Sequence, residues 1–229
     1  MTVITTHALP IINITLDVFD IMLIETFYLA FILQSSHPHF PSPNFLPLIS
    51  MTTQSPAQIS FEEAINQSQT LLEQVADGQI SDADLTAPIT DLVQTENGAR
   101  GFFVIYLTAD LPLADHPSQG LVKALQSSPE VVSELLVKNL AMSSATAISH
   151  DRNQDQEMAE GSKQVSRRTI ALIQMTNLPE TRAKLQRLKS TIQTGQGEYQ
   201  AFLERWGYDA EQKQVILAAI AACSGPNQD

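Results

Sequence analysis

The residues with the clearest chemical pattern lie at positions 151–157, which read Asp-Arg-Asn-Gln-Asp-Gln-Glu. Asp or Asn at alternate positions matches the first half of a calcium-binding EF-hand loop, which also requires glycine at position six and glutamate at position twelve. Those two positions hold Gln156 and Ser162, and Arg152 places a positive charge inside the loop. We therefore expect no calcium site and interpret the stretch as a polar loop between two helices.

Polar residues on both sides of this loop suggest a different kind of site. Side chains from two long helices could converge there on a groove that holds a ligand or a partner. Exposed helix faces also carry such residues as ordinary surface ion pairs, and that alternative stays open. The candidate groove residues are Asn139, Arg152, Asn153, Glu157, Arg167 and Arg168.

Other catalytic and metal-binding patterns are incomplete. His150 adjoins Asp151 and lies near several serines, but no Gly-x-Ser-x-Gly turn marks one serine as a nucleophile. The chain has no His-Glu-x-x-His, no pair of cysteines and no phosphate-binding glycine loop. The single Cys223 is typical of a small core residue or an inert surface thiol, and the lack of a second cysteine fits a reducing compartment. We expect no catalytic residues, no metal and no cofactor.

The charge of the chain is unevenly distributed. The formal net charge is −12, and residues 1–99 hold 11 of the 25 acidic residues and none of the 13 Lys and Arg. An acidic chain approaches a phosphate backbone against a repulsive field, so we expect no nucleic-acid partner. The pattern instead favours a protein partner with a basic surface. The basic helix expected over residues 180–193 of the same chain is a second candidate for this contact.

The elements that must position these residues are helices. Ser60 with Glu63, and Asp209 with Gln212, have the spacing of capping boxes, and Ser128-Pro129-Glu130 is a strong helix start. Apolar periodicity and Gly or Pro stop signals complete the assignment. We expect helices over residues 61–77, from 81 onward, and over 118–126, 128–149, 155–175, 180–193, 198–206 and 212–223.

Residues 101–108, Gly-Phe-Phe-Val-Ile-Tyr-Leu-Thr, are ambiguous by composition. Aromatic and β-branched residues favour a strand, and periodicity cannot separate a buried strand from a buried helix over so short a run. No second strand-like run exists to pair with it, and a lone strand leaves backbone donors unsatisfied. We predict a buried central helix.

The first 50 residues differ in composition from the rest. Residues 11–33 are strongly apolar, but Asp17, Asp20 and Glu25 interrupt them and no Lys or Arg flanks them. A secretory signal, a transit peptide and a membrane span are therefore not expected. We expect residues 1–50 to be a non-core extension, either disordered or upstream of a true start at Met51. A single helical domain should cover residues 51–225, with a disordered tail at 226–229.

Two stretches resemble a known group of proteins. Residues 97–108 and 136–144 are similar to segments of conserved, functionally uncharacterised helical proteins of cyanobacteria and plastids, and the resemblance covers about residues 55–220. It implies a cytoplasmic or stromal setting, or a thylakoid-peripheral one if residues 1–50 are translated. It implies no site residues.

These observations predict an all-α, compact multi-helix bundle of about six to eight helices with a non-core N-terminal extension. We expect a non-catalytic binding or assembly protein. One alternative is an enzyme or small-ligand-binding protein that uses the groove near Arg152, Glu157 and Arg167. Another is a peripheral membrane protein attached through residues 11–33.

Overall fold

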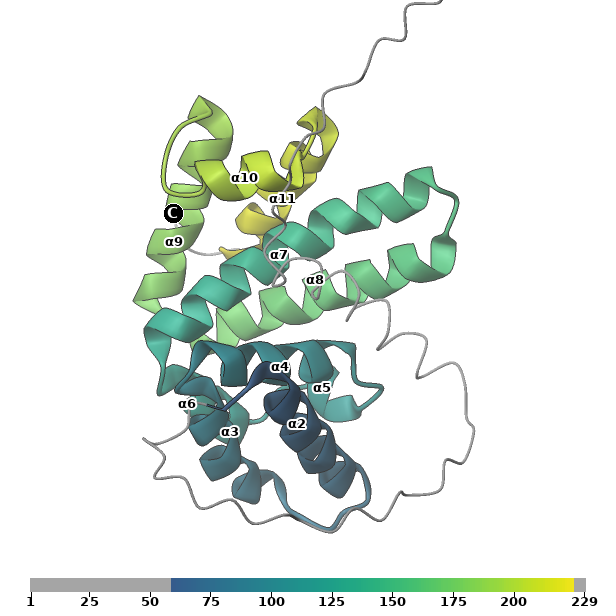
Figure 1. The fold of residues 1–229 in the computed structure, drawn as a ribbon, viewed down its shortest axis with the longest axis vertical. Helices are drawn as coiled ribbons and strands as arrows, with labels where there is room; N and C mark the ends of the chain where they lie inside the picture. Colours follow the sequence, from purple (N-terminus) through teal and green to yellow (C-terminus); the bar gives the residue numbers. More distant parts are fainter. Residues whose placement is uncertain (1–58, 225–229) are drawn as a thin grey trace, which may run out of the picture. The chain divides into compact units, whose positions relative to one another are not determined.

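The computed structural model describes residues 59–224, which form ten α-helices and one 3₁₀ helix, with no β-strand among them (Figure 1). The predicted all-α class is confirmed, and short elements such as the four-residue α5 account for the larger number of helices. The elements are α2 (Phe61–Ala76), η1 (Asp82–Leu85), α3 (Thr86–Val93), α4 (Glu96–Thr108), α5 (Pro112–Asp115), α6 (Gln119–Gln126), α7 (Pro129–Arg152), α8 (Gln156–Thr176), α9 (Pro179–Thr194), α10 (Gln200–Trp206) and α11 (Ala210–Cys223).

Three expectations concern residues outside the described part of the chain. These are the non-core extension at residues 1–50, its apolar segment at 11–33, and the tail at 226–229. They stay predictions.

The helix starts predicted from capping residues are confirmed. Glu63 donates its backbone N–H to Ser60 Oγ at 3.2 Å, and Ser60 donates its own to Glu63 Oε2 at 2.9 Å. Asp209 and Gln212 form the same reciprocal pair at the start of α11, at 2.9 and 3.1 Å. Each box satisfies two backbone N–H groups that a helix start leaves without partners.

One predicted helix is divided into two elements. The helix expected from Ser81 is instead the 3₁₀ helix η1 followed by α3. Pro88 is the physical reason, because it has no N–H to donate to the carbonyl of Asp84 and so cannot continue an α-helix that begins at residue 82. Pro88 is the third residue of α3, and the first four N–H groups of an α-helix have no partner within the helix. The missing N–H of Pro88 therefore costs α3 no hydrogen bond.

The ambiguous apolar run is a helix, as predicted. It forms the second half of α4, which begins earlier, where Thr95 Oγ1 accepts the backbone N–H of Gly98 at 3.1 Å. The aromatic side chains Phe102, Phe103 and Tyr106 are all fully buried. A helix buried on nearly all sides needs no polar face, which explains why periodicity gave no signal.

Helices α2 and α4 cross at two small residues. A Cβ atom added to Gly101 would lie 2.6 Å from Ala64 Cβ and 2.8 Å from two backbone atoms of α2. Glycine is therefore what allows the two helices to approach this closely.

An antiparallel pair, α7 and α8, separates the helices α2–α6 from α9–α11 (Figure 1). Helices α4 and α6 pack on one side of this hairpin, and α11 packs on the other against both of its members. Among the described helices, α7 alone has the length and apolar composition to cross a membrane, and 67% of that apolar window is buried inside the protein. In this fold α7 is the central core helix.

Candidate functional site

The last residue of α7, Arg152, binds the start of α11. Its Nη1 donates to Asp209 Oδ2 at 2.6 Å, and its Nη2 pairs with the Glu211 carboxylate. These bonds raise the pKa of Arg152, and the Arg152 hydrogen bond lowers the pKa of Asp209 to about 2. Arg152 therefore fixes the loop end of the hairpin to α11, and its guanidinium is engaged by the protein's own carboxylates.

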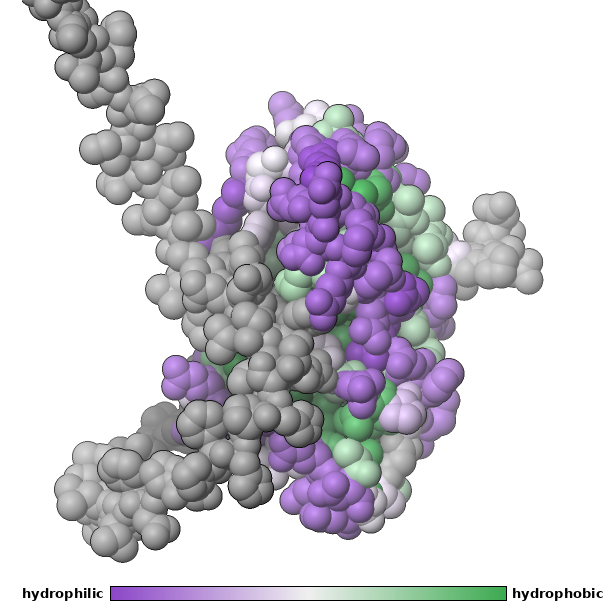
Figure 2. Space-filling view, turned by 90° about the vertical axis from the view of Figure 1, so that its right-hand side faces the viewer, coloured by the Kyte–Doolittle hydropathy of each residue, from purple (hydrophilic) through white to green (hydrophobic). Residues whose placement is uncertain are grey.

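The loop that resembled half an EF-hand has structural contacts instead. Asp155 caps α8 by accepting the Met158 N–H at 3.1 Å, and Asp151 pairs with Lys163 at 3.2 Å. Asn153 is the exposed C-terminal cap of α7. Figure 2 looks onto the side of the molecule that carries this loop, where hydrophilic residues predominate among the visible described residues. Within residues 59–224 no group of three His, Cys, Asp or Glu could hold a metal ion.

Arg168, another predicted groove residue, is buried elsewhere on the hairpin. Its side chain is 3% exposed and makes a two-point contact with Asp115, at 2.8 Å from Nε and 3.0 Å from Nη2. Its Nη1 also donates to the carbonyl oxygens of Leu107 and Ala109 at 2.9 and 2.8 Å. One guanidinium thus holds both the last turn of α4 and the loop that carries α5.

The six predicted groove residues do not gather at one place. Arg152 contacts α11, whereas Arg168 contacts α4 and the α5 loop, twelve residues, or about 18 Å, beyond the start of α8. Asn139 is buried in the middle of α7. Glu157 and Arg167 are exposed. Arg152, Asn153 and Glu157 thus lie at the loop end of the hairpin, and the other three lie elsewhere along it. Arg152 matches the surface ion-pair alternative.

A second charged feature is the acidic region, which we define as residues 59–99. It contains eight acidic residues and no Lys or Arg. The structure describes the side chains of seven of these acids, and none of the seven forms an ion pair. The ion pairs among the described residues all lie in the range 115–211. The next cation, Arg100, is buried with its guanidinium carbon 4.8 Å from the centre of the Phe61 ring.

Seven carboxylates of the acidic region are exposed: Glu62, Glu63, Glu73, Asp77, Asp84, Asp91 and Glu96. Glu62 and Glu73, with Asn66 and Gln69 between them, form an exposed polar stripe along α2. Hydrogen bonds from Ser60 and Ser81 lower the pKa values of Glu63 and Asp84, so these two carboxyls keep their charge in more acidic solution than usual.

The basic helix of the same chain does not neutralise it. Helix α9 packs on α7, α10 and α11, away from α2 and α3. Its Lys184 pairs with Glu134 at 3.0 Å, and Arg187 pairs with Glu198 at 2.9 Å. Lys184 and Arg187 are thus paired with acids near α9, and the expectation that α9 covers the acidic region is wrong.

The fold and its charged surfaces define an all-α protein built on a central helical hairpin. A family model described as Uncharacterised conserved protein UCP020893 matches residues 60–223, and the chain belongs to that family. No curated protein and no solved structure matches the chain. The matched residues include the helical core and all eight acids of the acidic region.

Proposed function

We propose that the protein is a non-catalytic binding module that assembles with a protein partner of basic surface through the acidic region. The observation that carries this proposal is the set of eight acidic residues in residues 59–99, a stretch that contains no Lys or Arg. Like charges concentrated on one part of a surface repel one another, and a basic partner removes that repulsion. Such complementarity accelerates encounter and suppresses wrong partners more than it adds affinity.

The stripe on α2 provides a test with a matched control. Glu62 lies in the first turn of its helix, and Glu73 accepts a hydrogen bond from Gln69 one turn earlier, at 3.0 Å. Glu157 and Glu204 have the same two roles in α8 and α10, with Gln200 donating to Glu204 at 2.8 Å. Changing either pair to Gln removes the same charge from the same helical positions. The two double variants therefore remove the same charge from exposed helix positions in different parts of the protein.

Affinity capture from native lysate should use three baits: wild type, the Glu62→Gln/Glu73→Gln variant and the Glu157→Gln/Glu204→Gln variant. The proposal expects a basic protein that binds wild type and the second variant, is lost from the first, and elutes at raised salt. Identical captured proteins on all three baits would contradict it. Circular dichroism checks that both variants keep the helical fold.

We also propose a cytoplasmic or stromal setting, thylakoid-peripheral if residues 1–50 are translated, in an organism with cyanobacterial or plastid ancestry. The similarity of residues 97–108 and 136–144 to proteins of that group supports this proposal. Fractionation of native cells with an antibody against the helical domain tests it. Recovery in a secreted fraction would exclude it.

A further inference from the structure

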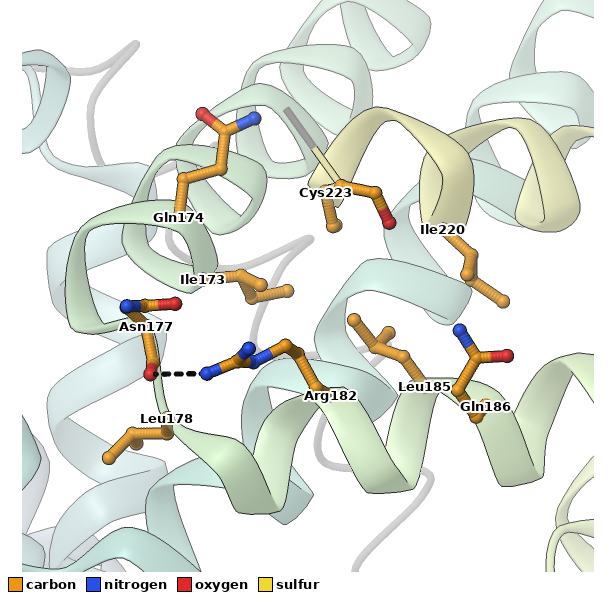
Figure 3. A pocket seen from close by; sticks show the side chains of 10 residues that line it. Ile173, Gln174, Asn177, Leu178, Arg182, Leu185, Gln186, Ile220 and Cys223 are labelled. Atoms are coloured by element: carbon orange, nitrogen blue, oxygen red, sulfur yellow. Dashed lines mark hydrogen bonds between the residues drawn. The ribbon is translucent and has the colours of Figure 1, made fainter. Parts of the chain in front are cut away.

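A pocket opens where the end of α8, the start of α9 and the end of α11 meet (Figure 3). Its volume is about 400 Å³, at the small end of the range for small-molecule sites. Four buried apolar side chains line it: Ile173, Leu178, Leu185 and Ile220. Gln174 Nε2 donates to the carbonyl oxygen of Ala222 at 2.8 Å and so ties α8 to the end of α11. Three helices therefore hold the pocket in place.

The rim of the pocket is polar and carries one cation. Gln174, Asn177 and Gln186 supply exposed amides, and Arg182 extends across the opening (Figure 3). Among the described residues the one hydrogen bond of the Arg182 side chain runs from Nη2 to the Asn177 carbonyl oxygen at 3.5 Å, longer than a good N–H···O bond. None of the lining residues is acidic. The Arg182 guanidinium thus has N–H groups that can donate to a ligand, beside an apolar surface.

We infer that this pocket binds a small amphipathic carboxylate, with its carboxylate on Arg182 and its aliphatic part on Ile173, Leu185 and Ile220. A guanidinium pairs with a carboxylate through two parallel N–H···O bonds, which a neutral alcohol cannot reproduce. The amides at the rim can donate further hydrogen bonds to the same head group. The volume accommodates a single short chain. This inference uses a different part of the surface from the acidic region and does not depend on the proposed partner.

The probe is octanoate, and octanol is the neutral probe of the same chain length. Titration of the full-length ¹⁵N-labelled protein should shift the side-chain amide signals of Gln174, Asn177 and Gln186. Octanoate should bind about tenfold more tightly than octanol. Arg182→Gln should remove that difference while leaving the fold intact, because Arg182 is exposed and weakly bonded.

Lys189→Gln is the matched control, since Lys189 is an exposed cation on the same helix and does not line the pocket. It should leave octanoate binding unchanged. Equal affinity for octanoate and octanol, equal losses in the two variants, or no shift of the pocket amides would each overturn the inference. A variant lacking residues 225–229 tests whether the C-terminal end of the chain itself occupies the pocket. If that variant binds octanoate and the full chain does not, the chain's own end fills the pocket and the inference fails.

Discussion

Arg168 and Asp115 form a two-point ion pair in which one partner is almost fully buried and the other is half exposed. The buried guanidinium is also the hydrogen-bond donor for the carbonyls of Leu107 and Ala109. Arg168 thus connects α8 to the end of α4 and to α5, whose contacting residues lie 53 to 61 positions earlier in the sequence. Breaking this contact should lower the stability of the fold, because it leaves buried polar groups without hydrogen-bond partners.

Arg168→Met should therefore destabilise the protein by about 2–4 kcal/mol, since it removes the donor from two carbonyl oxygens and one carboxylate. Urea denaturation followed by circular dichroism measures the change. The neighbouring Arg167 is exposed, and Arg167→Met should change the free energy of unfolding by less than about 0.5 kcal/mol. Equal effects of the two variants would show that the buried contact does not stabilise the fold.

Asp209 predicts a dependence of stability on acidity. Its folded pKa of about 2 lies below the value near 3.9 expected for an unfolded chain, mainly because of the Arg152 hydrogen bond. The stabilisation is therefore complete above about pH 4 and is lost as the pH falls through about 2. Asp209→Asn keeps an N-cap residue and removes the charge. The difference in Tm between wild type and Asp209→Asn should shrink as the pH falls from 6 to 2.

Asp155→Asn is the control for this experiment, because Asp155 also caps a helix but has no ion pair among the described residues. Its Tm difference from wild type should change much less over the same range. A pH profile that is the same for both variants would exclude the Arg152–Asp209 pair as the source.

Gly101→Ala tests the close crossing of α2 and α4. Alanine is favoured over glycine inside a helix by about 1 kcal/mol, so the variant would be more stable if the crossing were loose. The added Cβ would instead meet Ala64 Cβ at 2.6 Å, and overpacking costs about 1–3 kcal/mol. We expect net destabilisation by thermal melting. Adding Ala64→Gly should recover part of it, because that removes one of the contacts and leaves those with the α2 backbone.

Thr181 and Ser133 predict a non-additive pair of substitutions. Both are fully buried, and Thr181 Oγ1 donates to Ser133 Oγ at 2.7 Å between α9 and α7. Thr181→Val or Ser133→Ala alone leaves a buried hydroxyl without its partner and should cost about 1–2 kcal/mol. The double variant removes both hydroxyls and should be closer to wild type than the sum of the singles. Additive effects would contradict a coupled pair.

Much of the helical framework could be predicted from sequence because its signals are local. The capping boxes at Ser60 and Asp209, and the start at Pro129, depend on residues no more than three positions apart. The helix of residues 101–108 was inferred from the absence of a pairing partner, and it is indeed a buried helix.

The site residues could not be predicted in the same way because their partners are distant in sequence. Arg168 and Asp115 are 53 positions apart, and Arg152 and Asp209 are 57 apart. Both arginines were among the candidate groove residues predicted from the sequence. A charged residue on a helix, however, gives no indication of which element will pack against it. The pocket around Arg182 was missed for the same reason, since its lining comes from three helices and has no motif.

The central helix α7 has a consequence for how the protein is made. Its apolar window resembles a membrane span by length and composition, and α8, α9 and α11, which pack against it, all follow it in the chain. During synthesis α7 leaves the ribosome before these three helices have been made. Its apolar surface therefore stays exposed to water until they are synthesised and pack against it. Shortened forms that end between Arg152 and Ala210 retain this exposure permanently. Soluble expression therefore requires fragments that extend through α11.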